Sequence, residues 1–171
     1  ARSRTMTRAA MVELRLSRWH DALAHAEEAL RQHAHSETAM LARIVALRHL
    51  GSPQAETALA AAEAFDCLNV TLRALKYGAA PALYATLQSD PCQSALDMAQ
   101  DLTDLGETAL AAEILGGLPQ PCAMTAYVRG FLTGDTAVWM QAGKLPIGIA
   151  YPLRPLEYQA LTAAIAANPQ D

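Results

Sequence analysis

The strongest constraint on the fold of this chain is an apolar pattern with helical spacing that recurs after 33 residues. Two sets of three residues share the spacing i, i+4 and i+7: Ala22, Ala26 and Ala29, and then Ala55, Leu59 and Ala62. Residues at these offsets lie on one face of an α-helix. One helical hairpin cannot bury such a face alone, whereas stacked hairpins bury it between neighbours. The pattern therefore predicts helical hairpins that follow one another along the chain.

Residues that break helices divide the sequence into these hairpins. The breaks are expected at Ser17, Gly51, Gly78, Gly106 and Thr133-Gly134. Glycine at such a position ends one helix, and proline favours the first turn of the next. These breaks predict about ten helices in antiparallel pairs, with two short helices in 68–89. They leave 144–155 as an ordered loop. The last helix is expected over about Pro155 to Ala167.

Composition agrees with an all-α fold. Hydrophobic residues make up 52% of the chain but aromatic residues only 5%, and the excess is alanine and leucine, which favour helices. Residues 1–50 hold eight basic and five acidic residues, a balance of +3, whereas 51–171 hold five basic and twelve acidic residues, a balance of −7. An acidic total without aromatics among the basic residues disfavours nucleic-acid binding. No apolar run approaches the ~18 residues of a membrane span.

Several motifs resemble tetratricopeptide repeats, whose period is close to 34 residues. The stretch LSRWHDALAHAEEAL at 16–30 is similar to the second half of such a repeat, with an aromatic residue at Trp19 followed by regularly spaced alanines. Three later stretches occur in the order seen in a group of large bacterial proteins: FDCLNVTLRALKYG, LDMAQDLTDLGETALAAEIL and YPLRPLEYQALTAAIAANPQD. Those proteins combine a galactose-mutarotase-like β-sandwich with degenerate tetratricopeptide repeats and carry a domain of unknown function.

This resemblance implies an all-α, right-handed tetratricopeptide-like solenoid. We expect residues 1–171 to form a single helical-repeat domain, a fragment of a longer chain, because Asn168-Pro169 is similar to a linker that leads to a next helix. The function expected is that of a non-catalytic scaffold or protein-interaction module. The alternative is an accessory helical part of a carbohydrate-active enzyme whose catalytic β-sandwich is absent here. A regulatory repeat domain of a signalling protein is a third, weaker possibility.

The residues that carry chemistry do not form a catalytic or metal-binding pattern. The five histidines lack the spacing of a zinc hydrolase. The acidic pairs Glu27-Glu28 and Asp101/Asp104 are expected on solvated faces, and Arg154 is expected to anchor its loop to a neighbouring helix. We therefore expect no enzymatic activity, metal or cofactor.

The three cysteines are far apart in the sequence and indicate neither a disulfide framework nor a zinc site. Cysteines of this kind usually pack as small apolar residues. This use of cysteine favours a reducing compartment, so the cytoplasm is expected.

A binding surface is predicted on the first helices of the hairpins, which line the concave groove of a tetratricopeptide stack. The residues expected to face that groove, beside Leu41 and Val45, are Arg4, Arg15, Arg48 and His49. Arginine binds carboxylates or phosphates through two parallel hydrogen bonds. The expected partner is a protein or peptide, or a neighbouring domain of the same chain.

Two predictions concern large apolar side chains. Trp19 stands at a break, where a large residue would wedge the hairpins apart, and is expected to be substantially buried. Tyr158, Leu161 and Ile165 lie on one face of the last helix. Because that helix has few charges, this face is expected to stay partly uncovered within the chain.

Overall fold

The computed structural model describes residues 2–87, 90–148 and 152–169, and within these ranges it contains eleven α-helices and no β-strand. The all-helical prediction is therefore confirmed. The chain divides into two compact units, one of residues 1–72 with 104–106 and the other of residues 73–103 with 107–171. The expectation of a single domain over 1–171 stays a prediction.

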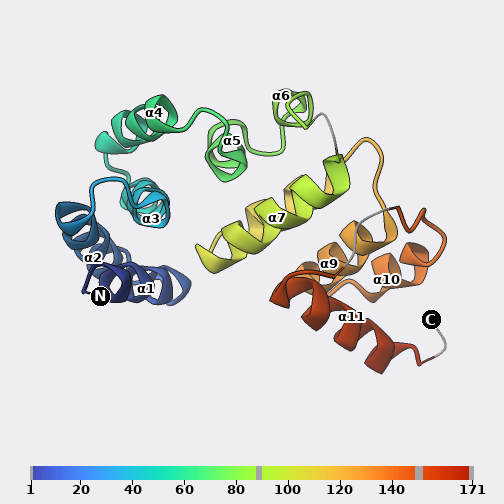
Figure 1. Ribbon diagram of the computed structural model, residues 1–171. Coiled ribbons are helices and arrows are strands. Elements are labelled where there is room, and N and C mark those ends of the chain that lie inside the picture. The colour runs from blue at the N-terminus through green and yellow to red at the C-terminus, as the bar shows by residue number, and fades with distance from the viewer. Residues whose placement is uncertain (1, 88–89, 149–151, 170–171) are drawn as a thin grey trace. The chain divides into compact units, whose positions relative to one another are not determined.

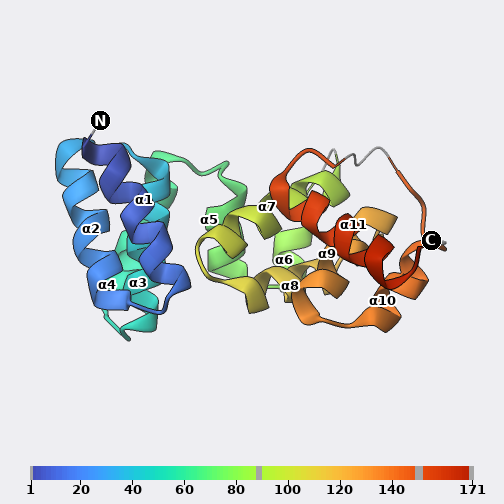
Figure 2. The ribbon, with the colours of Figure 1, turned by 90° about the horizontal axis from the view of Figure 1, so that it is seen from below.

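The first unit consists of two helical hairpins in succession. Its helices are α1 (Arg2–Arg15), α2 (Trp19–Gln32), α3 (Glu37–His49) and α4 (Gln54–Phe65). α3 packs against α1, α2 and α4, and the views in Figure 1 and Figure 2 both place it among them. A helix enclosed on several sides needs apolar residues around most of its circumference. The buried residues of α3 are Ala39, Leu41, Ala42, Ile44, Val45, Ala46 and Leu47.

The buried face of α2 is made of alanine alone. Ala22, Ala26 and Ala29 are fully buried, and we call these three residues the alanine seam. α2 packs between α1 and α3, and small side chains let neighbouring helices approach closely, because the distance between helix axes depends on the residues at the contact. The spacing recognised in the sequence is thus the packing face of α2.

The second unit is arranged around α9 (Ala123–Thr133), which packs against three other helices (Figure 2). These are α8 (Thr108–Gly116), α10 (Thr136–Ala142) and α11 (Pro155–Ala167). The unit also contains α6 (Pro81–Tyr84) and most of α7 (Pro91–Asp104), and α5 (Val70–Tyr77) begins in the first unit and continues into the second. The Tyr84 hydroxyl donates a hydrogen bond of 3.0 Å to the carbonyl oxygen of Ile114, which ties α6 to α8.

The predicted breaks coincide with backbone in the left-handed conformation. Positive φ angles occur at Ser17, Gly51, Gly78, Gly106, Gly134 and Gly148. Gly106 has a second constraint besides its φ of +84°, because an added Cβ would lie 3.1 Å from the carbonyl oxygen of Leu14. A larger residue there would be both strained and crowded. The two short helices in 68–89 and the last helix are also found where they were expected.

Ser36 occupies the N-cap position of α3, but its side chain makes no capping hydrogen bond. The expected loop at 144–155 includes 149–151, which lie outside the described residues. Residues 144–148 and 152–154 are not helical, and α11 starts at Pro155, as expected.

Large apolar side chains of α11 are exposed, as the sequence indicated. Tyr158 and Ile165 are each 57% exposed, and Leu161 is intermediate. Trp19 is intermediate in exposure, so most of its surface is covered, as expected, but it does not belong to the fully buried core. None of the described helices combines the length and apolar character that crossing a membrane requires.

Candidate functional site

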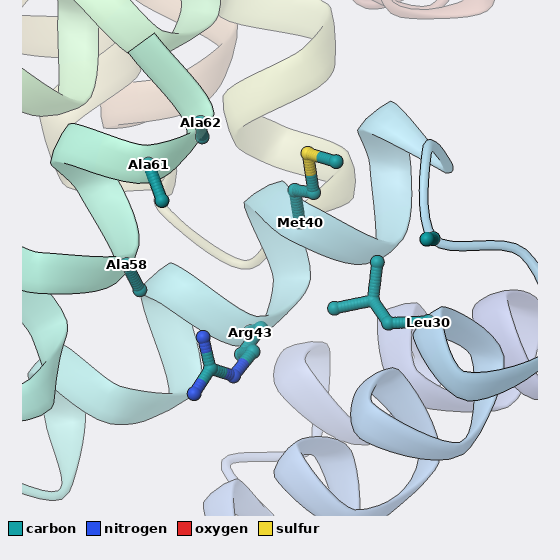
Figure 3. Close-up of a pocket in the computed structure, with 7 residues that line it drawn as sticks. Leu30, Met40, Arg43, Ala58, Ala61 and Ala62 are labelled. Carbon is teal, nitrogen blue, oxygen red and sulfur yellow. The ribbon is translucent and has the colours of Figure 1, made fainter. Parts of the chain in front are cut away.

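A small apolar pocket opens between α2, α3 and α4 in the first unit, and we call it the α3 pocket. Its cavity volume is about 210 Å³. Figure 3 shows Leu30 of α2 on one side and Ala58 and Ala61 of α4 on the other, with Met40 and Arg43 of α3 between them. Ala34 and Ala62 complete the lining. Arg43 is thus the one charged residue among seven that line the pocket.

The local sequence explains why the pocket is open. Met40 and Arg43 are three residues apart on α3, so their side chains lie on one face of that helix. Ala58, Ala61 and Ala62 occupy successive turns of α4, and their short side chains leave space that larger residues would fill. The pocket therefore exists because alanines of α4 face longer side chains of α2 and α3.

Arg43 gives this apolar surface a polar group. Its Nε lies 3.4 Å from Oε1 of Glu27, and the side chains of Arg43 and Glu27 are 30% and 41% exposed. A partly exposed ion pair of this kind contributes at most about 1 kcal/mol. A carboxylate on a bound molecule can therefore compete with Glu27 for the guanidinium group.

The size of the α3 pocket limits what it can bind. Pockets for drug-sized molecules and cofactors have volumes of roughly 300–1,000 Å³, so about 210 Å³ suits a single side chain better than a whole cofactor. In the part of the chain that the structure describes, no cluster of three or more histidine, cysteine or acidic residues could hold a metal ion.

The structure separates the four predicted binding residues into two places. The Ser3 hydroxyl donates to the Ala29 carbonyl oxygen at 3.3 Å, so the start of α1 lies beside the end of α2. α2 is likewise antiparallel to α3, because Trp19 at its start stacks on His49 at the end of α3. Arg15, Arg48 and His49 therefore lie at the same end of the first unit, where basic residues complement the helix dipoles. Arg4 lies about 16 Å from Arg15 along α1.

Three of these four residues already have partners within the first unit. Arg15 Nη1 lies 3.7 Å from Oδ1 of Asp104, and Arg48 Nη2 lies 3.3 Å from Oε1 of Glu56. The His49 ring stacks on Trp19 with the ring centroids 3.9 Å apart and the planes 4° apart. Arg4 is exposed. That these residues bind a partner stays a prediction.

The α3 pocket was not predicted from the sequence. Ala58 and Ala62 belong to the apolar pattern of α4 and are buried, whereas Ala61 is exposed. Arg43 and Met40 carried no sequence signal beyond their spacing of three residues. The pocket depends on how α2 and α4 flank α3, and a pattern within one helix does not contain that information.

In the second unit, a cluster of charged residues connects α7 to the start of α11. Arg154 Nε lies 2.9 Å from Oδ1 of Asp97, and Arg154 Nη1 donates to Oδ1 of Asp101 at 2.7 Å. Burial lowers the pKa of Arg154, but the hydrogen bond that Arg154 donates to Asp101 and the charges of Asp101, Asp97 and Glu157 together raise that pKa above its ordinary value. Arg154 therefore anchors its loop to a neighbouring helix, as expected.

Glu157 holds the first turn of α11 in the same region. Its side chain is almost fully buried, and Oε2 accepts hydrogen bonds from the backbone N–H groups of Leu153 at 2.5 Å and Arg154 at 3.1 Å. The N–H of Leu156 donates to Oε1 of Gln100 at 2.9 Å, which is a further link between α11 and α7. This cluster is thus engaged in organising the helix start.

The acidic pairs examined in the sequence are partly exposed, but they are also ion-paired. Glu27 contacts Arg43, and Glu28 contacts Arg31 at 2.5 Å. Asp101 and Asp104 contact Arg154 and Arg15, as described above. A solvated face is therefore only part of their role.

A second pocket of about 420 Å³ lies between α10 and α11. Its lining is formed by Thr136, Trp139, Met140, Ala164, Ala167 and Asn168, none of which is charged. The Trp139 indole donates to the carbonyl oxygen of Tyr127 at 3.0 Å and is thereby held in place. Thr136 and Asn168 are polar, but only Arg43 of the α3 pocket carries a charge among the residues that line the two pockets. The α3 pocket is therefore the better candidate for a site that selects a charged partner.

Comparison with known proteins found no match: no protein-family model, curated protein or solved structure matches this chain.

Proposed function

We propose that this chain is a non-catalytic helical-repeat interaction module of the tetratricopeptide type, a right-handed solenoid segment of a larger bacterial protein in the cytoplasm. Its partner is a protein or peptide segment, or a neighbouring domain of the same chain. The hairpins α1–α2 and α3–α4 support this proposal, because α1 also contacts α3 and successive hairpins therefore pack on each other. Contact between neighbouring repeats is the source of stability in repeat proteins.

The observation that carries the proposal is the α3 pocket. Six of its seven lining residues are apolar, and its volume of about 210 Å³ suits one apolar side chain of a partner. When one apolar side chain of a partner fills a pocket, that side chain supplies most of the binding free energy. The gain is about 25 cal/mol for each Å² of apolar surface that is removed from water. The pocket is formed by three helices, so it is held in shape before a partner arrives.

Charge adds a second requirement for the partner. Arg43 lies at the pocket, and the first 50 residues carry a balance of +3. A carboxylate beside the apolar anchor can pair with Arg43, with two parallel hydrogen bonds in the best geometry. The partner is therefore a segment in which an acidic residue lies close to a large aliphatic or aromatic side chain.

The test uses a library of short peptides displayed on phage, selected on the full chain, followed by fluorescence anisotropy with the selected peptides. Ala61→Leu fills the pocket from an exposed position of α4, and Ala60→Leu is its control, because Ala60 is also exposed but does not line the pocket. Ala61→Leu is expected to weaken binding by about tenfold or more, which corresponds to about 1.4 kcal/mol. Ala60→Leu is expected to leave binding unchanged.

Arg43→Gln tests the charge requirement. It is expected to weaken binding of peptides that contain the acidic residue and to have little effect on versions in which that residue is an amide. Equal binding by the wild type and Ala61→Leu would exclude the α3 pocket as the site. Binding to a panel of glycans in place of peptides would favour the alternative, an accessory part of a carbohydrate-active enzyme.

A further inference from the structure

Two cysteines that are distant in the sequence lie together in the second unit. Cys92 is the second residue of α7, and Cys122 is the N-cap residue of α9. The Cys92 thiol donates at 3.6 Å to the carbonyl oxygen of Gln120, which lies two residues before Cys122. Cys122 is also close enough to raise the pKa of the Cys92 thiol. Both cysteines are reduced. The fold thus brings together two thiols that are 30 positions apart in the sequence, and proximity is the first requirement for a disulfide.

The surroundings hold Cys122 firmly in this position. Cys122 is only 3% exposed. Its backbone N–H donates to Oγ1 of Thr125 at 3.1 Å, and the Thr125 hydroxyl donates back to the Cys122 carbonyl oxygen at 2.8 Å. Cys92 is intermediate in exposure, so it is the thiol of the pair that a reagent from solvent reaches first. The pair thus consists of an accessible thiol close to a buried, fixed one.

We propose that Cys92 and Cys122 are a redox site, which forms an intramolecular disulfide when the chain meets a small-molecule disulfide. In the first step the Cys92 sulfur attacks the reagent disulfide, forms a mixed disulfide and releases one thiolate of the reagent, which takes up a proton. In the second step the Cys122 sulfur loses its proton, attacks the Cys92 sulfur and releases the second thiolate of the reagent, which takes up a proton in turn. The two protein thiols are oxidised by two electrons, and the reagent disulfide is reduced to two thiols.

The environment of Cys92 makes this reaction slow at neutral pH. Burial, followed by the hydrogen bond and charge of Cys122, raises the pKa of the Cys92 thiol to about 12. Only the thiolate is nucleophilic, and a raised pKa lowers the thiolate fraction at any pH below it. The oxidation rate is therefore expected to rise about tenfold for each pH unit between pH 7 and pH 9. The site responds to sustained oxidising conditions rather than to a brief exposure.

The disulfide would constrain the second unit. It would join the first turn of α7 to the start of α9 and close a loop of 31 residues, from 92 to 122 inclusive. Such a loop restricts the unfolded chain, so the oxidised form is expected to melt roughly 5–15 °C above the reduced form.

The experiment uses the full chain with Cys67→Ser, because Cys67 is exposed and would otherwise form its own adducts. The variant is treated with oxidised glutathione at pH 8, the remaining thiols are alkylated, and peptides are mapped by mass spectrometry without reduction. A peptide that joins Cys92 to Cys122, together with the raised melting temperature, is the expected result. Circular dichroism of the untreated variant checks that Cys67→Ser is folded.

Two matched variants identify the order of the steps. In Cys67→Ser/Cys122→Ala, Cys92 is expected to stop at a stable mixed disulfide with glutathione. In Cys67→Ser/Cys92→Ala, the buried Cys122 is expected to react far more slowly. The proposal would be overturned if Cys67→Ser formed glutathione adducts without the internal bridge, or formed disulfide-linked dimers in place of it. That result does not depend on the folding of either double variant.

Discussion

At the scale of single residues, the contact between Trp19 and His49 shows how the hairpins meet. Trp19 opens α2 and His49 ends α3, and their rings stack in nearly parallel planes. His49 is exposed and Trp19 is intermediate in exposure, so the pair covers one end of the first unit rather than filling its core. Stacked aromatic pairs contribute about 0.5–1.5 kcal/mol beyond the burial of their surface.

Trp19→Ala is expected to lower the free energy of unfolding by about 1–3 kcal/mol, less than the 3–5 kcal/mol typical of a fully buried aromatic residue. His49→Ala is expected to have a smaller effect. In a double-mutant cycle followed by urea denaturation and circular dichroism, the coupling between the two is expected to be about 0.5–1.5 kcal/mol. Additive effects would show that the rings do not stack in solution.

The structural role of a residue is predicted best from the sequence when that role depends only on the local backbone conformation. Left-handed backbone favours glycine, so the breaks at Gly51, Gly78, Gly106 and Gly134 could be located from sequence alone. The contact of Cys92 with the segment before Cys122 could not be predicted from the sequence, because it depends on the packing of the second unit. The same is true of the degree of burial of Trp19.

At the scale of elements, the clearest connection is the one that Arg154 makes from the start of α11 to two carboxylates of α7. Asp97 and Asp101 are four residues apart and therefore face the same side of α7. The planar guanidinium group reaches both at 2.9 Å and 2.7 Å. The single ammonium group of lysine lacks this forked geometry.

Arg154→Lys is therefore expected to lower the free energy of unfolding by about 1–2 kcal/mol although the charge is kept. The matched control is Arg31→Lys, because Arg31 pairs with Glu28 on an exposed face of α2 and such a pair contributes little. Both variants are compared by urea denaturation at low and high salt. If Arg31→Lys lost as much stability as Arg154→Lys, the result would contradict a stabilising role for the contact of the Arg154 guanidinium group with both carboxylates.

Helices were predictable because their periodicity lies within one segment, and most of the expected elements are found. The α3 pocket was not predictable, because it arises where two helices flank a third. The binding surface expected from Arg4, Arg15, Arg48 and His49 was inferred from the usual arrangement of repeats. The structure places Arg4 away from the other three, and a pattern in the sequence cannot position residues of different helices that precisely in space.

At the scale of the whole molecule, the two compact units each have their own buried residues. The chain contains two tryptophans, and one lies in each unit, Trp19 in the first and Trp139 in the second. Each is therefore a fluorescent reporter of its own unit.

Unfolding of the two units is expected to occur at different urea concentrations. In Trp139→Phe the fluorescence reports the first unit, and in Trp19→Phe it reports the second. Circular dichroism on both variants provides a measure of total helix, which controls for effects of the substitutions themselves. Coincident transitions by all probes would instead support one cooperative domain over residues 1–171.

The alanine seam has a consequence for how such a chain diverges in evolution. The positions that hold α2 in place accept only small side chains, so they tolerate few replacements. Yet alanine is among the most frequent residues of all proteins, and three alanines at helical spacing carry little information about ancestry. The exposed positions of the same helix are free to drift, and they hold most of its distinguishing residues. A helix joined to its neighbours by alanine can therefore keep its geometry long after its sequence has lost any trace of common descent.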